Sequence, residues 1–379
     1  MGPRRVVLGV GVAGYPEGGI GNSWIYLNWA LAFRQLGWEV WLVEEVPGDR
    51  LQGPGGPMGL EQSAQAAHWR RMLDRFGLKG TLMAEGSSWP EDGSREFVAK
   101  ADWLVNLSGH FKRWEQIRSV PRRVYVDLDP GFTQAWAQGY GVDMNLEGHT
   151  DFATVALGWN DPESRVPRDG REWLPVAPPV ALDWWRYCPP ASGRACWTTV
   201  THWYGYPQIE WEGMVLDNKS SEFLKVAGLP ERCAVRLRLA TDLQPGWDDY
   251  HRMQERGWDL VPVREVCRDL ESYGGFIEAS AGEFSVAKGG YVVMNSGWFS
   301  DRTVCYLASG RPAVVQETGW SRHLPTGAGL AAFQDEGEAV RALAQQASDR
   351  DRSAEGARRL AEEFFDGRKV VAKLIKSVG

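Results

Sequence analysis

The chain has 379 residues, of which 43% are hydrophobic and 24% charged, and its formal net charge is −7. This length exceeds the usual size of one hydrophobic core, so we expect two domains. An acidic chain lacks the excess of Lys and Arg that neutralises phosphates, which argues against nonspecific binding to nucleic acid or to an anionic membrane. The five scattered cysteines include no CxxC pair. The sequence therefore indicates neither a disulfide framework nor a zinc ribbon, and a cytoplasmic protein is expected.

The first 45 residues predict a βαβ unit. Residues 5–12 are β-rich, but this apolar run is too short for a signal peptide. Residues 24–36 carry an apolar stripe at helical spacing, and Gly37 ends this helix before a second strand at 39–44. No stretch of the chain approaches the roughly 18 apolar residues that span a bilayer. A parallel α/β domain is the expected result.

A glycine pattern lies between this first strand and its helix. Gly9, Gly11 and Gly14 have the GxGxxG spacing of dinucleotide-binding proteins. They lie in the strand and its exit, however, and the predicted helix starts about ten residues later. We therefore expect these glycines to let the backbone approach a ligand closely or to make a turn. For the same reason an NAD-dependent oxidoreductase is the least favoured function.

Two later strands end in polar residues. The run 103–107 leads into a Ser-Gly-His tip that ends at His110, and the run 123–128 leads into a tip that contains Asp127 and Asp129. Sheets of α/β proteins place ligand groups at the carboxyl ends of their strands. His110 suits a base or a hydrogen bond to a substrate hydroxyl, although a lone loop histidine is more often a surface residue. Asp127 and Asp129 either share a face or belong to a solvated loop.

A proline-rich segment at 174–193 is the best domain boundary in the chain. A second α/β run begins after it with a strand at 197–201. Further predicted helices are 62–76, 221–226, 247–254, 336–345, 353–365 and 369–377, and further predicted strands are 152–157 and 236–240.

The segment 278–319 predicts an anion site. Residues 303–308 carry a helical stripe, Gly310 stands where a C′ glycine belongs, and an apolar strand follows at 313–315. Residues 296–300 then form a loop at a helix N-terminus, where free N–H groups and the helix dipole favour an anion. Lys288 and Arg302 nearby suit a phosphate or diphosphate, although a well-capped strand–loop–helix unit explains the pattern without a ligand.

Five segments form a wider pattern: GGIGNSW near the N-terminus, then RRVYVDLDPGFTQ, GEFSVAK, SGWFSDRTVCYLASGRPAVV and LPTGAGL. Over nearly the whole chain they resemble bacterial glycosyltransferases of the GT-B type, similar to enzymes of families 1 and 4. The first segment is similar to the acceptor loop of that family and the fourth to its donor loop. The resemblance implies an α/β fold in which two Rossmann-like domains, 1–180 and 191–365, face each other across a cleft. It also implies a C-terminal helix, 366–379, that crosses back to the first domain.

The resemblance further implies an activity and its site residues. A hexosyltransferase of this type moves a sugar from a UDP-, dTDP- or GDP-linked donor to a hydroxyl of a small molecule or glycan, without a metal or other cofactor. His110 and Asp129 would be catalytic. The residues Gly19, Ile20, Gly21, Asn22 and Trp24 would bind the acceptor. The residues Lys219, Glu283, Phe284, Ser285, Lys288, Ser296, Gly297, Trp298, Phe299, Ser300, Asp301 and Arg302 would bind the donor, with the backbone N–H groups of 297–300 on its diphosphate.

The sequence departs from that family at one point. Retaining GT-B enzymes carry two glutamates around the donor helix, and Gly297 and Cys305 occupy their positions here. Neither accepts hydrogen bonds from a sugar or ribose as a carboxylate does. Glu283 and Asp301 are the candidates to replace them, although a carboxylate near a helix N-terminus also complements the dipole. A degenerate GT-B protein that binds a nucleotide or a partner stays open, and the few carboxylates disfavour a nucleotide-sugar epimerase.

Overall fold

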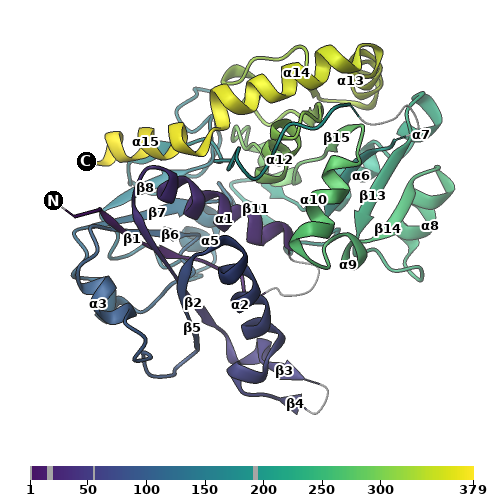
Figure 1. Ribbon diagram of the computed structural model, residues 1–379. Coiled ribbons are helices and arrows are strands. Elements are labelled where there is room, and N and C mark those ends of the chain that lie inside the picture. Colours follow the sequence, from purple (N-terminus) through teal and green to yellow (C-terminus); the bar gives the residue numbers. More distant parts are fainter. Residues whose placement is uncertain (1, 15–19, 54–55, 191–194) are drawn as a thin grey trace.

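The computed structural model describes residues 2–14, 20–53, 56–190 and 195–379. In this part of the chain the strands form two large parallel sheets, each covered by helices (Figure 1). The first sheet has the order β5-β2-β1-β6-β7-β8-β9. Its strands are β1 (Arg5–Gly9), β2 (Glu39–Val46), β5 (Lys79–Ala84), β6 (Trp103–Leu107), β7 (Arg122–Asp127), β8 (Asp151–Thr154) and β9 (Trp173–Pro175). The accompanying helices and the small hairpin are α1 (Ile20–Gln35), η1 (Gly48–Arg50), β3 (Gln52–Gly53), β4 (Gly56–Pro57), η2 (Leu60–Gln62), α2 (Ala64–Phe76), α3 (Ser94–Ala99), α4 (Trp114–Ile117) and α5 (Phe132–Gly139).

The second sheet has the order β14-β13-β10-β15-β16-β17. Its strands are β10 (Trp197–Thr201), β13 (Leu237–Thr241), β14 (Asp259–Pro262), β15 (Gly282–Ser285), β16 (Ala313–Gln316) and β17 (Leu330–Phe333), beside the antiparallel pair β11 (Ile209–Trp211) and β12 (Met214–Leu216). The helices are α6 (Lys219–Lys225), α7 (Leu229–Arg232), α8 (Asp248–Glu255), α9 (Val263–Val266), α10 (Leu270–Glu278), α11 (Gly289–Val293), α12 (Asp301–Ala308), η3 (Trp320–Arg322), α13 (Glu336–Ser348), α14 (Arg350–Leu360), η4 (Ala361–Phe365) and α15 (Gly367–Val378). None of the described helices combines the length and the apolar character needed to cross a membrane.

The strand order of both sheets is that of a doubly wound fold. In the first sheet the chain moves outward from β1 through β2 to β5, and then returns to the other side of β1 at β6. In the second sheet the same reversal places β15 beside β10. All residues of β6 and of β10 are buried, as expected of central parallel strands that helices cover on both faces. The predicted α/β class with two Rossmann-like domains is confirmed, and ligand groups are expected where the order reverses.

One hydrophobic cluster spans both domains, in addition to a smaller cluster inside each domain. Helix α1 of the first domain packs against α10 and α12 of the second. Helix α15, in yellow in Figure 1, returns to the first domain and packs along α1. There the amide of Gly367 donates to the carbonyl of Val180 at 2.9 Å, and a Cβ on Gly367 would lie 2.8 Å from that of Ala32. The carboxyl edges of the two sheets are therefore held against each other.

Some predicted elements differ from the structure. Helix α1 begins at Ile20, four residues before the predicted start, because Ile20 is already buried against the core. Residues of the polar-looking Glu-Phe-Ser segment form strand β15, in which every residue is buried. The pattern gave no indication of strands β5, β9, β14 and β17. The predicted helix at 353–365 is α14 followed by a π-helical turn, η4.

Candidate functional site

The loop that follows β7 is shaped by a buried carboxylate. Asp127 accepts hydrogen bonds from the amide of Asp129 at 3.0 Å and from the hydroxyls of Thr133 and Thr154 at 2.7 and 3.0 Å. The side-chain amide of Gln134 adds a bond of 3.1 Å. Burial raises the pKa of Asp127 to about 6, although these hydrogen bonds act in the opposite direction. Asp127 is therefore a buried structural residue that holds the loop carrying Asp129 in place.

Asp129 links the first domain to the second. Its carboxylate accepts hydrogen bonds from the ammonium of Lys288 at 2.6 Å, from the hydroxyl of Tyr206 at 3.0 Å and from the hydroxyl of Tyr291. Burial alone would raise the pKa of Asp129, but the charge of Lys288 and these hydrogen bonds lower it below its usual value. Asp129 is therefore ionised, and its partners all belong to the other domain.

Lys288 is enclosed on several sides. Its ammonium lies 3.7 Å from the ring centroid of Tyr206, 5.3 Å from that of Tyr291 and 5.5 Å from that of Phe132. Burial lowers the pKa of Lys288, and the pairing with Asp129 opposes this effect. In this structure the predicted phosphate-binding lysine thus has an internal carboxylate as its partner.

A second ion pair lies inside the second domain. The Arg302 Nε atom donates to Glu283 at 2.5 Å, and its other nitrogens donate to the carbonyl of Val200 at 2.7 Å and to the hydroxyl of Ser285 at 2.9 Å. Glu283 is fully buried on β15, and its Oε2 atom has no hydrogen-bond partner among the described residues. Arg302 therefore joins β10, β15 and α12. The alternative that Glu283 complements a helix dipole is wrong, because Glu283 lies on β15, and the predicted donor-binding Arg302 has internal partners in this structure.

Lys219 differs from these two cations. It is the first residue of α6, and its ammonium lies 5.9 Å from the ring centroid of Trp298. No carboxylate pairs with it in the described part of the chain. Burial, followed by repulsion from Arg302 and Lys288, lowers the pKa of Lys219 well below its usual value. Lys219 is thus a cationic side chain that forms no ion pair in the described part of the chain, although the charges of Glu283 and Asp129 oppose the lowering of its pKa.

The predicted donor loop is an interface between the domains. The amide of Gly297 donates to the carbonyl of Thr318 at 2.6 Å, and that of Trp298 to the hydroxyl of Ser296 at 3.2 Å. The amide of Gly158, in the first domain, donates to the carbonyl of Ser296 at 3.2 Å. The N–H groups of Gly297 and Trp298 are thus already bonded, so they do not form the predicted anion site. These N–H groups donate within the second domain, while the carbonyls of Ser296 and Gly297 accept hydrogen bonds from the first domain, and the local pattern showed neither arrangement.

Other predicted donor residues belong to the core or to the helix cap. Phe284 stacks on Phe333 with ring centroids 5.0 Å apart, and Phe299 stacks on Phe365 at 5.2 Å. Both phenylalanines are buried, so their assignment to donor binding also needs correction. Ser300 caps α12 by accepting a hydrogen bond from the amide of Arg302 at 3.2 Å.

Two further titratable side chains lie near Asp129: Asp301, which is half-buried, and His110, which is exposed. The carboxylate of Asp301 has no side-chain partner among the described residues, and burial together with the charge of Asp129 raises its pKa to about 7. The ring of His110 is exposed and meets that of Tyr26 edge-on, with centroids 6.0 Å apart. The surrounding protein lowers the pKa of His110, while the charge of Asp129 raises it. A neutral imidazole beside an ionised carboxylate can accept a proton.

Most of the predicted acceptor residues lie in the domain interface. Ile20 and Trp24 are buried, and a Cβ on Gly21 would meet the ring of Tyr273 at 3.5 Å. Gly21 and Asn22 are half-buried. Gly19 lies outside the described residues. The start of α1 therefore packs on the second domain, so Ile20 and Trp24 are not available to an acceptor in this structure.

The glycine-rich exit of β1 binds an internal anion that the sequence reasoning missed. Glu44 accepts hydrogen bonds from the amides of Val12, Ala13 and Gly14 at 2.7, 2.8 and 2.9 Å. Successive amides of this kind bind phosphates in dinucleotide-binding domains, and here a carboxylate occupies them. Burial raises the pKa of Glu44 to about 7, with the three amides opposing. An acidic residue at the end of the apolar strand β2 was the available signal.

Two glycines in the exit of β1 allow side chains to pack closely against the backbone. A Cβ on Gly9 would lie 2.5 Å from the Oδ1 atom of Asn106, and one on Gly11 would lie 2.9 Å from the ring of His110. These two glycines thus allow a close approach of side chains of the chain itself, whereas the prediction concerned a ligand or a turn. Because Glu44 occupies the amides and the glycines face these side chains, the loop is not a dinucleotide-binding loop.

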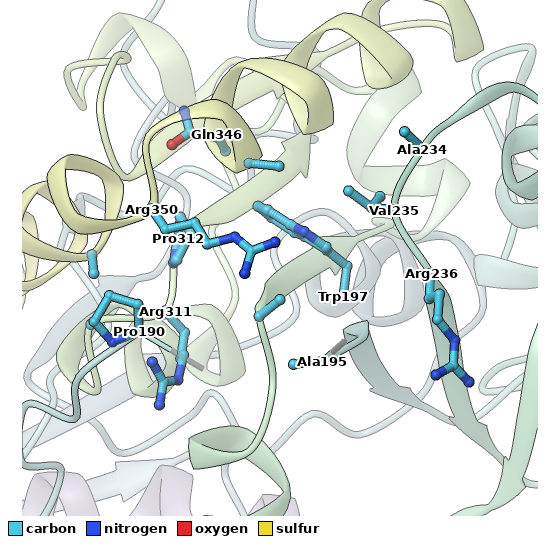
Figure 2. A pocket seen from close by; sticks show the side chains of 14 residues that line it. Pro190, Ala195, Trp197, Ala234, Val235, Arg236, Arg311, Pro312, Gln346 and Arg350 are labelled. Carbon is cyan, nitrogen blue, oxygen red and sulfur yellow. The ribbon is translucent and has the colours of Figure 1, made fainter. Parts of the chain in front are cut away.

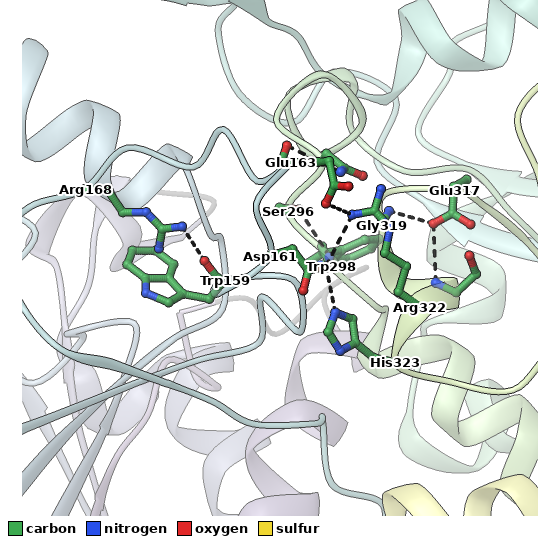
Figure 3. A network of polar contacts seen from close by, with 12 residues as sticks. Trp159, Asp161, Glu163, Arg168, Ser296, Trp298, Glu317, Gly319, Arg322 and His323 are labelled. Atoms are coloured by element: carbon green, nitrogen blue, oxygen red, sulfur yellow. Dashed lines mark hydrogen bonds and ion pairs between the residues drawn. The ribbon is translucent and has the colours of Figure 1, made fainter.

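A second polar contact joins the domains away from Asp129. Figure 3 shows Asp161 and Glu163 of the first domain facing Arg322 and His323 of the second. The Nε2 atom of His323 lies 2.9 Å from Asp161, and the guanidinium of Arg322 lies 2.7 Å from Glu163 and 3.5 Å from Asp161. Arg322 is 44% exposed, so this contact is screened by solvent more than the one at Asp129.

Comparison with known proteins places the fold. No family model and no curated protein matches the chain. Among solved structures, AviGT4, a glycosyltransferase involved in avilamycin A biosynthesis, superposes with a TM-score of 0.54 at 15% identity, covering 99% of this chain and 97% of its own. Alr3699/HepE of Anabaena, in complex with UDP and glucose, gives 0.54 at 11% identity with 99% and 100% coverage. Sucrose-phosphate synthase of Thermosynechococcus elongatus gives 0.53 at 13% identity with 99% and 98% coverage. The chain therefore has the GT-B fold over its whole length, as the resemblance implied.

Proposed function

We propose that the protein is a glycosyltransferase that moves a sugar from a nucleoside-diphosphate donor to a hydroxyl group. The observation that carries this proposal is the charge arrangement where the two carboxyl edges meet. Lys219, Lys288 and Arg302 gather on the second domain, Asp129 faces them from the first, and His110 lies near Asp129. The GT-B fold of the solved glycosyltransferases supports the same reading.

The donor diphosphate would bind beside Lys219. A departing nucleoside diphosphate gains negative charge, and cations that are already in place stabilise it without rearrangement. Lys219 is suited to this role because it forms no ion pair with a carboxylate of the described residues and because its ammonium lies 5.9 Å from the ring centroid of Trp298. A bound diphosphate would favour the protonated form of Lys219, so nucleotide binding should take up protons. Cationic side chains in this role make a metal unnecessary, and the donor is linked to UDP, dTDP or GDP.

The acceptor hydroxyl would be activated by His110. Its exposed ring is neutral at pH 7, because the pKa is lowered, and it can take the hydroxyl proton. The ionised Asp129 then stabilises the imidazolium that forms, since its charge already raises the pKa of His110. Asp301 can serve the donor sugar as a hydrogen-bonding carboxyl group, because its side chain is not engaged elsewhere in the described chain.

A second candidate is a protein that binds a nucleotide and transfers nothing. The packing of the donor loop favours it, because a Cβ on Gly297 would lie 2.0 Å from the amide nitrogen of Gly158. Cys305 is buried, and its thiol lies 3.8 Å from the side-chain amide of Asn28 in the first domain. A glutamate fits at neither position without separating the domains. This candidate retains the Lys219 site and predicts no turnover.

The test is nucleotide binding followed by donor hydrolysis. UDP, dTDP and GDP are added during thermal unfolding; a nucleotide at about 100 times its dissociation constant should stabilise the chain by roughly 2.7 kcal/mol. Lys219→Ala should abolish the stabilisation, and Lys373→Ala, at an exposed position of α15, should retain it. Release of sugar from the matching nucleotide sugar then separates the enzyme from the binder. No stabilisation by any nucleotide would refute both candidates.

A further inference from the structure

The segment that joins β10 to α6 forms a small antiparallel hairpin. Residues 202–218 leave the carboxyl end of β10, form β11 and β12, and return to the second domain at the start of α6. Trp211 pairs with Met214 across a turn whose two residues, Glu212 and Gly213, have φ angles of +46° and +75°. Two positive φ angles are those of a type I′ turn, which suits a tight hairpin. A two-stranded hairpin is barely stable by itself in water, so its packing partners determine where it lies.

The outer edge of this hairpin is attached to helix α5 of the first domain. Glu210 and Val215 face each other next to the hydrogen-bonded pair at the turn, so the amide and carbonyl of Glu210 point away from β12. The hydroxyl of Tyr140 satisfies both groups, because it donates to the carbonyl at 3.0 Å and accepts from the amide at 2.9 Å. The ring of Trp211 covers the end of α5, where a Cβ on Gly139 would lie 2.7 Å from it. A segment of the second domain is thus bonded to, and packed on, the first.

The base of the hairpin covers the ion pair between the domains. Tyr206 donates its hydroxyl to Asp129 at 3.0 Å, and its ring centroid lies 3.7 Å from the ammonium of Lys288. The same ring contacts those of Phe132 and Trp136 on α5, with centroids 5.6 and 4.8 Å apart. The side chains of Asp129 and Lys288 are 24% and 14% exposed. Tyr206 therefore helps to enclose both charged groups at the junction.

A cavity lies beside the connection between the domains, at the opposite, amino edge of the second sheet. Its volume is about 250 Å³, and its lining includes Pro190 and Ala195 of the connection, Trp197 at the start of β10, and residues of α13 and α14 (Figure 2). Close-packed protein resists movement, whereas a cavity beside the connecting chain leaves room for it. The contacts at the carboxyl edge, which include those of the hairpin, then hold the junction closed.

We propose that residues 202–218 are a latch, which holds the domains closed over Asp129 and Lys288 and exposes both side chains when it leaves α5. The segment is suited to this role because its two ends stay in the second domain while its outer edge is bonded to the first. The bond can also be released, since Tyr140 is 48% exposed and water can replace its hydroxyl at Glu210. The latch does not depend on the proposed function, because its test contains no nucleotide.

The test is acetylation of the full chain by acetic anhydride, with the modified lysines quantified by mass spectrometry. Tyr140→Phe removes the hydroxyl that bonds to Glu210 and should raise the rate at Lys288 about fivefold, the effect of one ordinary hydrogen bond on an equilibrium. Lys373, exposed on α15, is the internal reference, and its rate should not change. Amide hydrogen exchange of residues 206–216 should become faster in the same variant.

Tyr204→Phe is the matched control. Tyr204 lies in the same segment, but its hydroxyl donates to Asp249 inside the second domain at 2.9 Å, so its loss should leave the rate at Lys288 unchanged. Equal acceleration at Lys288 in both variants would mean that the segment loosens generally and is no latch on the first domain. An unchanged rate at Lys288 in Tyr140→Phe, or a faster rate without faster hydrogen exchange of residues 206–216, would also overturn the proposal.

Discussion

Replacing Arg302 by alanine should destabilise the second domain strongly. The substitution removes the partner of Glu283, which is fully buried, together with the bonds from Arg302 to Val200 and Ser285. Breaking a buried ion pair by removing one partner costs about 3–5 kcal/mol, because the remaining charge is left without compensation. At about 2–4 °C per kcal/mol for a domain of this size, we expect the melting temperature to fall by about 6–20 °C.

The measurement is urea unfolding, with Arg322→Ala as the control. Arg322 also contacts carboxylates, but it is 44% exposed, so its removal should cost at most about 1 kcal/mol. A loss below about 1 kcal/mol in Arg302→Ala would refute the reasoning. Joint replacement by Arg302→Met and Glu283→Gln should recover much of the stability, since no buried charge then remains. Because Arg302 has this structural role, Lys219→Ala is the better probe of nucleotide binding.

Three further predictions concern the interface and the first domain. Asp129→Asn removes the charge that Lys288 pairs with across the interface, so small-angle X-ray scattering should detect a larger radius of gyration; an unchanged radius would mean that apolar contacts suffice. Burial raises the pKa of Glu44 from 4.5 to about 7, so ionisation of Glu44 is less favourable in the folded chain than in the unfolded chain. From about pH 4.5 to about pH 7 the wild type should therefore lose about 1–3 kcal/mol relative to Glu44→Gln, and parallel pH profiles of unfolding would contradict this. Gly297→Ala should cost more than about 2 kcal/mol, because φ is +73° and the new Cβ would lie 2.0 Å from the amide nitrogen of Gly158. Gly275→Ala, in open space on α10, should be neutral or slightly stabilising, and equal effects of the two would refute the steric argument.

The sequence predicts the elements whose local pattern agrees with their burial. Strands β6 and β10 begin and end at the predicted residues, because both are rich in apolar and β-branched residues, with Asn106 as the exception in β6. The same reasoning fails at β15, where Glu283 makes a buried strand look like a polar segment. The charge of Glu283 is compensated by Arg302, which lies 19 residues further along the chain. A local pattern does not contain that information.

The prediction of the site residues also succeeds where a local rule applies and fails where a long-range contact decides. The rule that ligand groups follow the carboxyl ends of strands correctly brings Asp129 and Lys288 to one junction. Their contact joins residues 159 apart in the sequence, and Tyr291 lies 162 residues from Asp129. No periodicity or motif predicts such a pairing. It depends on how two separately folded sheets meet, and only the structure gives that relation.

The ion pairs of Glu283 and Asp129 respond differently to a movement of the two domains. Glu283 and Arg302 lie in the same domain, so their pairing survives any change between the domains. Asp129 belongs to the other domain, so Lys288 loses its carboxylate whenever the domains separate. An anion bound beside Lys219 would then compete with Asp129 for Lys288. If so, Asp129→Asn should bind the nucleoside diphosphate more tightly while it loosens the interface, as titration calorimetry can measure. Weaker binding in that variant would mean that Asp129 and the nucleotide assist each other.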